Sequence, residues 1–254
     1  MARIAVTGAA GNVGRVTVET LDSDHDVTPI THREREGLDS VILDVRDEDA
    51  LTEAFEGHDI VVHLAANPNP DAAWDSVYEV NIGGTYNVYE AALAADVDRL
   101  VFASTNHVHQ MYNIADPARP ETLAADTEAV GVSDPARPDS YYGVSKVFGE
   151  ALGNYYADRH GLEVLNLRIG WLLTAEELRE KMDEEEAVAR YVRAMWLSPD
   201  DCAQGMRRAV ESPLPDSPLA VNLVSANDDR YLSLTETMRA IGYRPRDNSA
   251  TVVE

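Results

Sequence analysis

The stretch Val6-Thr7-Gly8-Ala9-Ala10-Gly11-Asn12-Val13-Gly14, close to the amino terminus, decides the fold. Its glycines recur every three residues, after an apolar run at Arg3–Thr7 and at the start of a helical pattern at Val13–Leu21. Gly8 permits a tight turn, Gly11 lets the backbone approach a pyrophosphate, and Gly14 allows close packing of helix on strand. The helix N-terminus favours the anion. We expect a dinucleotide to contact the residues of this loop: Gly8, Ala10, Gly11, Asn12, Val13 and Gly14.

Short apolar runs alternate with helical patterns along most of the chain. Strands are expected at Val27–Thr31, Val41–Leu43, Asp59–Leu64, Leu100–Ala103, Glu163–Ile169 and Val221–Val224. Helices are expected at Asp49–Phe55, Trp74–Ala95, Tyr141–His160, Glu176–Arg193, Trp196–Val210 and Leu234–Ile241, of which Glu176–Arg193 is charged enough to predict a solvated face. This alternation predicts an α/β protein, a Rossmann-like doubly wound parallel sheet with a small C-terminal substrate-binding region.

The length of 254 residues is compatible with a single domain. Its cofactor part is expected at about 1–165, and its substrate part at about 166–254 together with the segment 113–140. That segment is rich in Pro, Asp, Ala and Glu and predicts a long loop. A lid over the substrate and a solvated insertion both remain open.

The charge balance excludes some partners. The chain has 21 basic and 45 acidic residues, a net charge of −24, which argues against a nucleic-acid partner. Only Lys146 and Lys181 are lysines. An acidic, lysine-poor surface resembles that of proteins from salt-loving archaea and predicts salt-dependent stability, although an ordinary acidic protein is the alternative. The single cysteine and the lack of a long apolar run predict a cytoplasmic protein with no membrane segment and no metal site.

The spacing Tyr142-Gly143-Val144-Ser145-Lys146 lies on an expected helix, so that the tyrosine and lysine share one face. A nearby ammonium stabilises phenolate, and the tyrosine could then take a proton from an alcohol while hydride leaves for a nicotinamide. A packing tyrosine beside a solvated lysine is the alternative for the bare spacing. The scarcity of lysine elsewhere favours a function for Lys146.

Two hydroxyls end the strand that begins at Leu100. We select Thr105 to polarise the substrate oxygen, with Ser104 as the second candidate and a turn-forming pair as the alternative.

The residues after the second strand bear on the choice of cofactor. An acid there would bind a ribose 2′-hydroxyl, but the chain reads Thr31-His32-Arg33-Glu34-Arg35. His32 and Arg33 suit a 2′-phosphate, whereas Glu34 would supply the acid if the strand ran longer. NADP is slightly favoured over NAD. Asp44 and Val45 follow the third strand and could contact adenine, although a nearby aspartate could instead cap a helix.

Four segments together resemble the extended short-chain dehydrogenase/reductase superfamily, also called the epimerase/dehydratase superfamily: Thr7–Gly14, His63-Leu64-Ala65-Ala66, Asn81-Ile82-Gly83-Gly84-Thr85 and Tyr142–Lys146. The resemblance implies a tyrosine base, a lysine on the nicotinamide ribose and a Ser/Thr partner. It also implies cofactor contacts at Leu64, Ala65, Ala66 and Asn81. The usual homodimer would form through Trp74–Ala95 and Tyr141–His160. His63, inside an apolar strand, is expected to be structural.

A narrower similarity, to uronate dehydrogenases and haloarchaeal glucose-6-phosphate dehydrogenases, rests on Ala103–His107, Tyr142–Glu150, Trp196–Asp201 and Gly242–Pro245. It implies oxidation of the anomeric carbon of an aldose to a lactone, with Thr105 as hydroxyl partner and Asn106 and His107 touching the sugar. The chain departs from these relatives at Asn67–Pro70 and Trp171, so a hexose 6-phosphate, a hexuronate and a pentose all remain possible substrates.

Arg190 and Arg193 could clamp an anionic group of the substrate, or could pair with Glu184–Glu186 on a solvated helix. Two other functions stay open. A sugar epimerase or dehydratase would retain the cofactor, and a regulatory NAD(P)-binding protein would not turn over at all.

Overall fold

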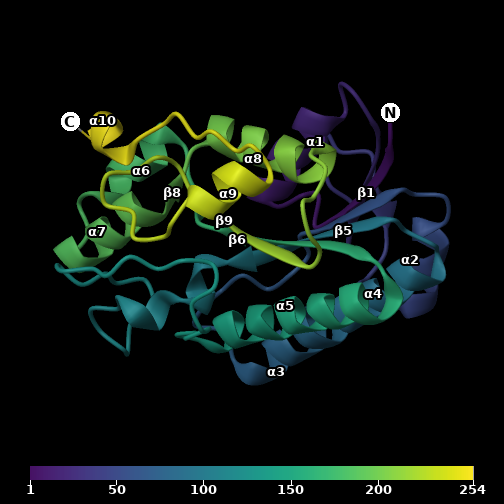
Figure 1. The fold of residues 1–254 in the computed structure, drawn as a ribbon, viewed down its shortest axis with the longest axis horizontal. Helices are drawn as coiled ribbons and strands as arrows, with labels where there is room; N and C mark the ends of the chain where they lie inside the picture. Colours follow the sequence, from purple (N-terminus) through teal and green to yellow (C-terminus); the bar gives the residue numbers. More distant parts are fainter. Residues whose placement is uncertain (254) are drawn as a thin grey trace.

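Seven strands form the central sheet of the computed structural model, which describes residues 1–253 (Figure 1). They are β1 (Arg3–Thr7), β2 (Asp26–Thr31), β3 (Val41–Ile42), β4 (Ile60–His63), β5 (Arg99–Thr105), β6 (Glu163–Ile169) and β9 (Leu219–Leu223). The spatial order is β3-β2-β1-β4-β5-β6-β9, and every neighbouring pair is parallel. The chain reverses its direction of travel across the sheet between β1 and β4. In a doubly wound fold this is the point where a ligand binds, so the expected fold class is confirmed.

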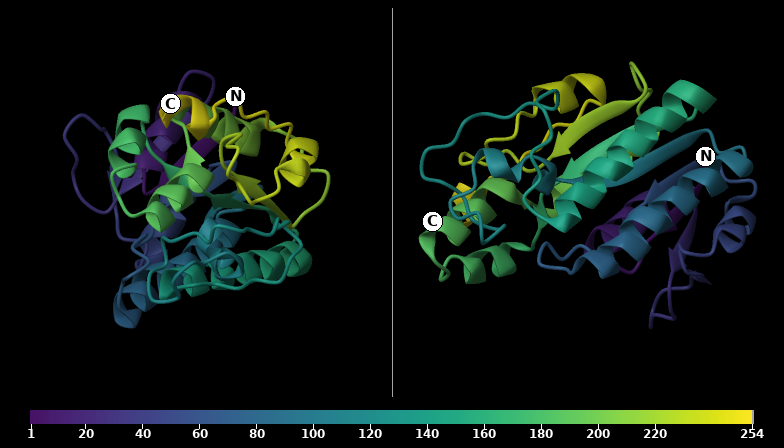
Figure 2. Two further views of the ribbon diagram at one scale, coloured as in Figure 1. Left: turned by 90° about the vertical axis from the view of Figure 1, so that its left-hand side faces the viewer. Right: turned by 90° about the horizontal axis from the view of Figure 1, so that it is seen from below.

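Helices cover both faces of the sheet. One face carries α2 (Glu48–Phe55), α4 (Gly84–Ala94) and α5 (Tyr141–His160), and the other carries α1 (Asn12–Leu21) and α8 (Pro199–Glu211) (Figure 1). Seen from below, α4 and α5 run side by side (Figure 2). Tyr89 and Tyr156 stack between them at 5.1 Å between ring centroids. The bounds of α5 and β6 agree with the sequence prediction, and those of α1, α2 and β2 differ by a single residue.

The expected helix Trp74–Ala95 is broken, which corrects the prediction. It consists of α3 (Trp74–Val77), a π-helical turn at Tyr78–Gly83 labelled η1, and α4. A π turn inserts one extra residue, and such turns are frequent at functional sites. Here the buried Asn81 lies in that turn and bonds to the loop after β4 through both side-chain atoms. A periodicity count over the whole segment does not detect one inserted residue.

The charged segment Glu176–Arg193 was also expected as one helix, and this is wrong. The structure divides it into α6 (Ala175–Lys181) and α7 (Glu186–Met195). One face of α7 is buried, including Tyr191 and Met195, so the expectation of a solvated face fails for this helix. The next expected helix begins later than predicted. Trp196–Leu197 is strand β8, which pairs with β7 (Trp171–Leu172), and α8 starts at Pro199 after the N-cap Ser198.

The C-terminal part gathers beyond the carboxyl ends of the central strands, where α6, α7, β7–β8 and α10 (Ser249–Val253) lie together (Figure 1). The short helix α9 (Thr235–Ala240) packs on β9. No helix in residues 1–253 has both the length and the apolar character that crossing a membrane requires.

The segment 113–140 is a loop, as expected. It is anchored to the C-terminal part by backbone bonds from Leu123 N to Ala187 O and from Val130 N to Tyr231 O. The Arg168 guanidinium also donates to Val132 O. These bonds hold the loop over the end of the sheet where a substrate would lie, which favours a covering role over a freely solvated insertion.

Candidate active site

The glycine loop has the geometry that a dinucleotide requires. Gly8 adopts φ 71°, and a Cβ there would lie 2.6 Å from Ala65 N, because the turn after β1 rests against the chain that leaves β4. A Cβ on Gly14 would lie 2.3 Å from Gly8 O. Helix α1, which lies within the described residues, has no side-chain N-cap bond and no acid in its first turn. Its N-terminal N–H groups therefore remain available to a pyrophosphate, and the residues fit the expected cofactor.

A histidine and an arginine follow the end of β2. His32 and Arg33 are exposed just beyond Thr31, and Arg33 forms no ion pair within residues 1–253. The Asp44 carboxylate is paired with Arg46 at 2.7 Å, and this bond lowers the pKa of Asp44. Val45 is buried against Gly84, and the N-cap of α2 is Asp47. The aspartate that caps a helix after the third strand is therefore Asp47, and not Asp44.

Tyr142 and Lys146 are buried one turn apart on α5. The Lys146 Nζ donates to Ala103 O at 2.7 Å and lies 5.8 Å from the centroid of the Tyr142 ring. Ser145 Oγ donates to Tyr142 O and accepts from Asn81 Nδ2, so these bonds join the π turn to α5. The sequence spacing predicted this shared face, and the structure places both side chains at the carboxyl end of β5.

Burial shifts both groups away from their charged forms. It raises the pKa of Tyr142 to about 12, against the lowering effect of a hydrogen bond with Thr105, and it lowers the pKa of Lys146 to about 7. The phenol of Tyr142 is therefore protonated at neutral pH, whereas Lys146 titrates near neutral pH.

Thr105 and Ser104 have different partners. The Thr105 hydroxyl interacts with Tyr142 and lies 3.5 Å from Asn106 Oδ1. Ser104 Oγ instead donates to Glu150, two turns along α5 from Tyr142. The geometry thus supports Thr105 rather than Ser104 as the hydroxyl partner.

Asn106 and His107 belong to a buried network. His107 Nδ1 lies 2.8 Å from Asp139 Oδ2, and its Nε2 lies 3.2 Å from the Tyr191 hydroxyl. Asn106 Nδ2 donates to the same hydroxyl at 2.8 Å. The Asp139 side chain is fully buried, and its carboxylate accepts a hydrogen bond from Nδ1, which orients the imidazole ring. The His107 ring meets the Tyr142 ring edge-on at 5.7 Å, which places the whole network beside the tyrosine.

Arg190 and Arg193 are not brought to this network. Arg190 donates to Leu123 O and pairs with Glu186, and Arg193 pairs with Glu186 and Asp229. Of the two alternatives for these arginines, the described residues show the pairing with the acidic segment, through Glu186, and the face of α7 that enters the site presents Tyr191. His63 bonds to the hydroxyls of Thr7 and Thr85, and burial lowers its pKa to about 3. It is a neutral packing residue between β1 and α4.

Sequence reasoning missed three residues of the site: Asp139, Glu150 and Tyr191. Glu150 carried a detectable signal, because it follows Lys146 by one turn on the same buried face of α5. It accepts two bonds from Arg168, at 2.7 and 2.9 Å. The sequence carried no such signal for Tyr191 and Asp139, since their contacts depend on how α7 and the end of the loop 113–140 pack over β5.

Comparisons with known proteins find relatives that match most or all of the chain. The model of the NAD dependent epimerase/dehydratase family matches residues 4–215. An L-arabinose 1-dehydrogenase (NAD(P)(+)) of Haloferax volcanii is 94% identical over 100% of both chains. A NAD-dependent glucose-6-phosphate dehydrogenase of the same organism is 34% identical over 97% of this chain and 94% of its own. A mutant uronate dehydrogenase from Agrobacterium tumefaciens, solved with NAD, is 30% identical with a TM-score of 0.80, over 99% and 87% of the two chains.

Proposed function

The chain belongs to the NAD dependent epimerase/dehydratase family, and on this basis we propose that it is an aldose 1-dehydrogenase that oxidises L-arabinose to its lactone. As an NAD(P)-dependent oxidoreductase it acts on a CH–OH group. The observation that carries the choice of sugar is the 94% identity over the full length of the L-arabinose 1-dehydrogenase. The buried cluster of Tyr142, Lys146 and Thr105 carries the choice of chemistry.

Each side chain has a defined task in this proposal. Thr105 donates a hydrogen bond to the anomeric oxygen, and Tyr142 removes the proton from the same oxygen. Lys146 holds the nicotinamide ribose and, when charged, favours the phenolate of Tyr142. Asn106 and His107 orient the sugar. NAD(P)⁺, when bound, accepts the hydride that leaves C1. Residues of the loop Gly8–Gly14, Leu64–Ala66 and Asn81 hold the cofactor in place.

The test is cofactor reduction by a panel of sugars in molar salt, followed by absorbance. L-arabinose should reduce NAD⁺ or NADP⁺ with a higher kcat/KM than D-glucose 6-phosphate or D-glucuronate. If a sugar acid or sugar phosphate were the better substrate, the proposed function would be wrong. If no sugar reduced either cofactor, a retained-cofactor epimerase or a regulatory protein would be favoured instead.

We also propose that the substrate part comprises about 166–254 and the loop 113–140, with the cofactor part at about 1–165. Tyr191 from α7 meets His107 from the end of β5, so the two parts share one site. The backbone bonds from the loop to Ala187 of α7 and to Tyr231 support the same division.

Arg33 is proposed to bind the 2′-phosphate of NADP. Replacing Arg33 by serine should raise KM for NADP⁺ about tenfold, because a charge-assisted hydrogen bond contributes roughly 1.5–3 kcal/mol. KM for NAD⁺ should stay within about twofold of the wild type, since NAD⁺ lacks that phosphate. Steady-state kinetics with both cofactors, with Arg35→Ser as the matched control, measure the effect. An equal rise for both cofactors in Arg33→Ser would contradict the assignment.

The chain is proposed to form a homodimer through the face built by α3, η1, α4 and α5. That face exposes large side chains that include Trp74, Tyr86, Tyr141 and Tyr155, each at least 41% exposed. Exposed aromatic side chains gathered on one face are typical of a protein interface. The mass by sedimentation should be that of two chains, and Tyr86→Arg should reduce it to one. Met238→Arg, at an exposed position on α9, should remain dimeric, and a monomeric wild type would refute the proposal.

A further inference from the structure

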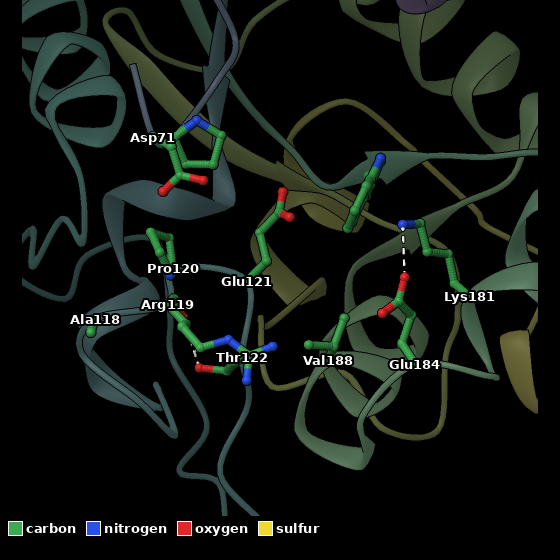
Figure 3. Close-up of a pocket in the computed structure, with 11 residues that line it drawn as sticks. Asp71, Ala118, Arg119, Pro120, Glu121, Thr122, Lys181, Glu184 and Val188 are labelled. Carbon is green, nitrogen blue, oxygen red and sulfur yellow. Dashed lines mark hydrogen bonds and ion pairs between the residues drawn. The ribbon is translucent and has the colours of Figure 1, made fainter. Parts of the chain in front are cut away.

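A cavity of about 280 Å³, just below the size range of small-molecule sites, is lined by Trp171 and by Val188 of α7, the helix that carries Tyr191 (Figure 3). Its walls come from the segment after β4, the loop 118–122, β7, α6 and α7. The charged side chains that line it are Asp71, Arg119, Glu121, Lys181 and Glu184. The Glu121 side chain extends from its loop into the middle of this group (Figure 3).

A row of aromatic rings connects the cavity to the catalytic tyrosine. Trp171 lines the cavity and lies 6.1 Å from the Tyr191 ring. Tyr191 lies 6.1 Å from the His107 ring, which in turn meets Tyr142. If Asn106 and His107 hold the sugar, as in the proposed function, its distal end lies on the side of Tyr191, whose hydroxyl bonds to both residues, and hence toward this cavity.

The charges in the cavity do not cancel. Lys181 pairs with Glu184 at 3.6 Å and lies over the Trp171 ring at 5.6 Å, and Arg119 pairs with Glu185. Within residues 1–253, Asp71 and Glu121 have no ion-pair partner. Glu121 also makes no side-chain hydrogen bond to another described residue. Its partial burial raises the pKa of the carboxyl, which indicates that the ionised form is poorly solvated there.

We propose that the Glu121 carboxylate selects the substrate class at this site: it accepts hydrogen bonds from the hydroxyls of a neutral aldose and repels a sugar with a distal carboxylate or phosphate. The inference rests on the proposed function and assigns to it a specificity-determining residue. Two relatives are named for glucose 6-phosphate and for uronate, which are anionic sugars. In this chain the two arginines that could bind such an anion are paired with acidic residues, and the unpaired carboxylates of Asp71 and Glu121 line the cavity.

Three sugars of one ring configuration isolate the effect of charge. L-arabinose, D-galactose and D-galacturonate share their C2–C4 configuration, and they carry at C5 no substituent, a hydroxymethyl group and a carboxylate, respectively. The measured quantity is the ratio of kcat/KM for D-galacturonate to that for D-galactose, at fixed salt and above neutral pH. The competitive inhibition constant of D-galacturonate against L-arabinose gives the same comparison without turnover.

Glu121→Gln should raise the galacturonate-to-galactose ratio at least tenfold and tighten the inhibition by D-galacturonate to a similar degree. Glu121→Asp, which keeps the charge, should stay near the wild-type ratio. Asp126→Asn removes one charge from an exposed position of the same loop and should leave the ratio unchanged. A ratio in Glu121→Gln within twofold of the wild type would overturn the proposal, and so would an equal rise in Asp126→Asn. If the proposed function itself were wrong, the result would be different: the wild type would not oxidise L-arabinose.

Discussion

Replacing Tyr142 by phenylalanine is expected to lower kcat for L-arabinose oxidation by roughly three orders of magnitude, because proton removal by a positioned base contributes about 10²–10⁴-fold. Only the hydroxyl is lost, so the ring still packs edge-on against His107. Steady-state kinetics should show the loss in kcat, and fluorescence titration should show cofactor affinity within about twofold of the wild type. The tyrosine would not be the base if the variant kept a tenth of the wild-type rate.

The pH dependence follows from the same group. Tyr142 acts as a base only when deprotonated, and its pKa is raised to about 12 by burial. The active fraction therefore grows as pH rises through the alkaline range, and the oxidation rate of the wild type should rise with it. Residual activity in Tyr142→Phe should lack this rise.

Glu150→Gln should have the largest effect on stability. Arg168 donates two hydrogen bonds to Glu150, and the two side chains are only 7% and 12% exposed. Removing the carboxylate leaves a buried guanidinium without its counter-charge, which costs about 3–5 kcal/mol. For a chain of this size the midpoint of thermal unfolding should fall by roughly 10 °C.

The matched control for Glu150→Gln is Glu79→Gln. Glu79 pairs with Arg46 at 3.3 Å, but the side chains are 63% and 54% exposed. Exposed pairs contribute about 0–1 kcal/mol, so this variant should unfold within a few degrees of the wild type. Both variants are measured by calorimetry in the same molar salt. A loss below about 1 kcal/mol in Glu150→Gln would mean that the pair does not stabilise the fold.

The parts of the fold that depend on local pattern were predictable from the sequence. The glycine loop, the strands of the sheet and the helix of Tyr142 and Lys146 follow from spacing and hydrophobic periodicity, which are local properties. The break at Tyr78–Gly83 was not predicted, because its cause is the set of bonds that Asn81 makes to distant residues. Trp196–Leu197 was assigned to a helix for a similar reason, since only pairing with β7 makes it a strand.

The site residues likewise divide into those that a local motif predicts and those that depend on tertiary packing. Tyr142, Lys146 and Thr105 lie where their motifs predicted, at the carboxyl edge of the sheet. Tyr191 lies in a charged segment that was predicted to have a solvated face. Only the packing of α7 brings the Tyr191 hydroxyl to Asn106 and His107. Glu121 lies in a loop without hydrophobic periodicity, so the sequence does not indicate which way its side chain points.

Hydride transfer from the anomeric carbon is the central claim, and isotope transfer tests it most directly. L-arabinose labelled with deuterium at C1 is incubated with the enzyme and NADP⁺, and the reduced cofactor is examined by mass spectrometry and NMR. The account predicts one deuterium at C4 of the nicotinamide ring for each lactone formed. Reduced cofactor without deuterium, or a sugar isomer formed with no net reduction, would contradict it.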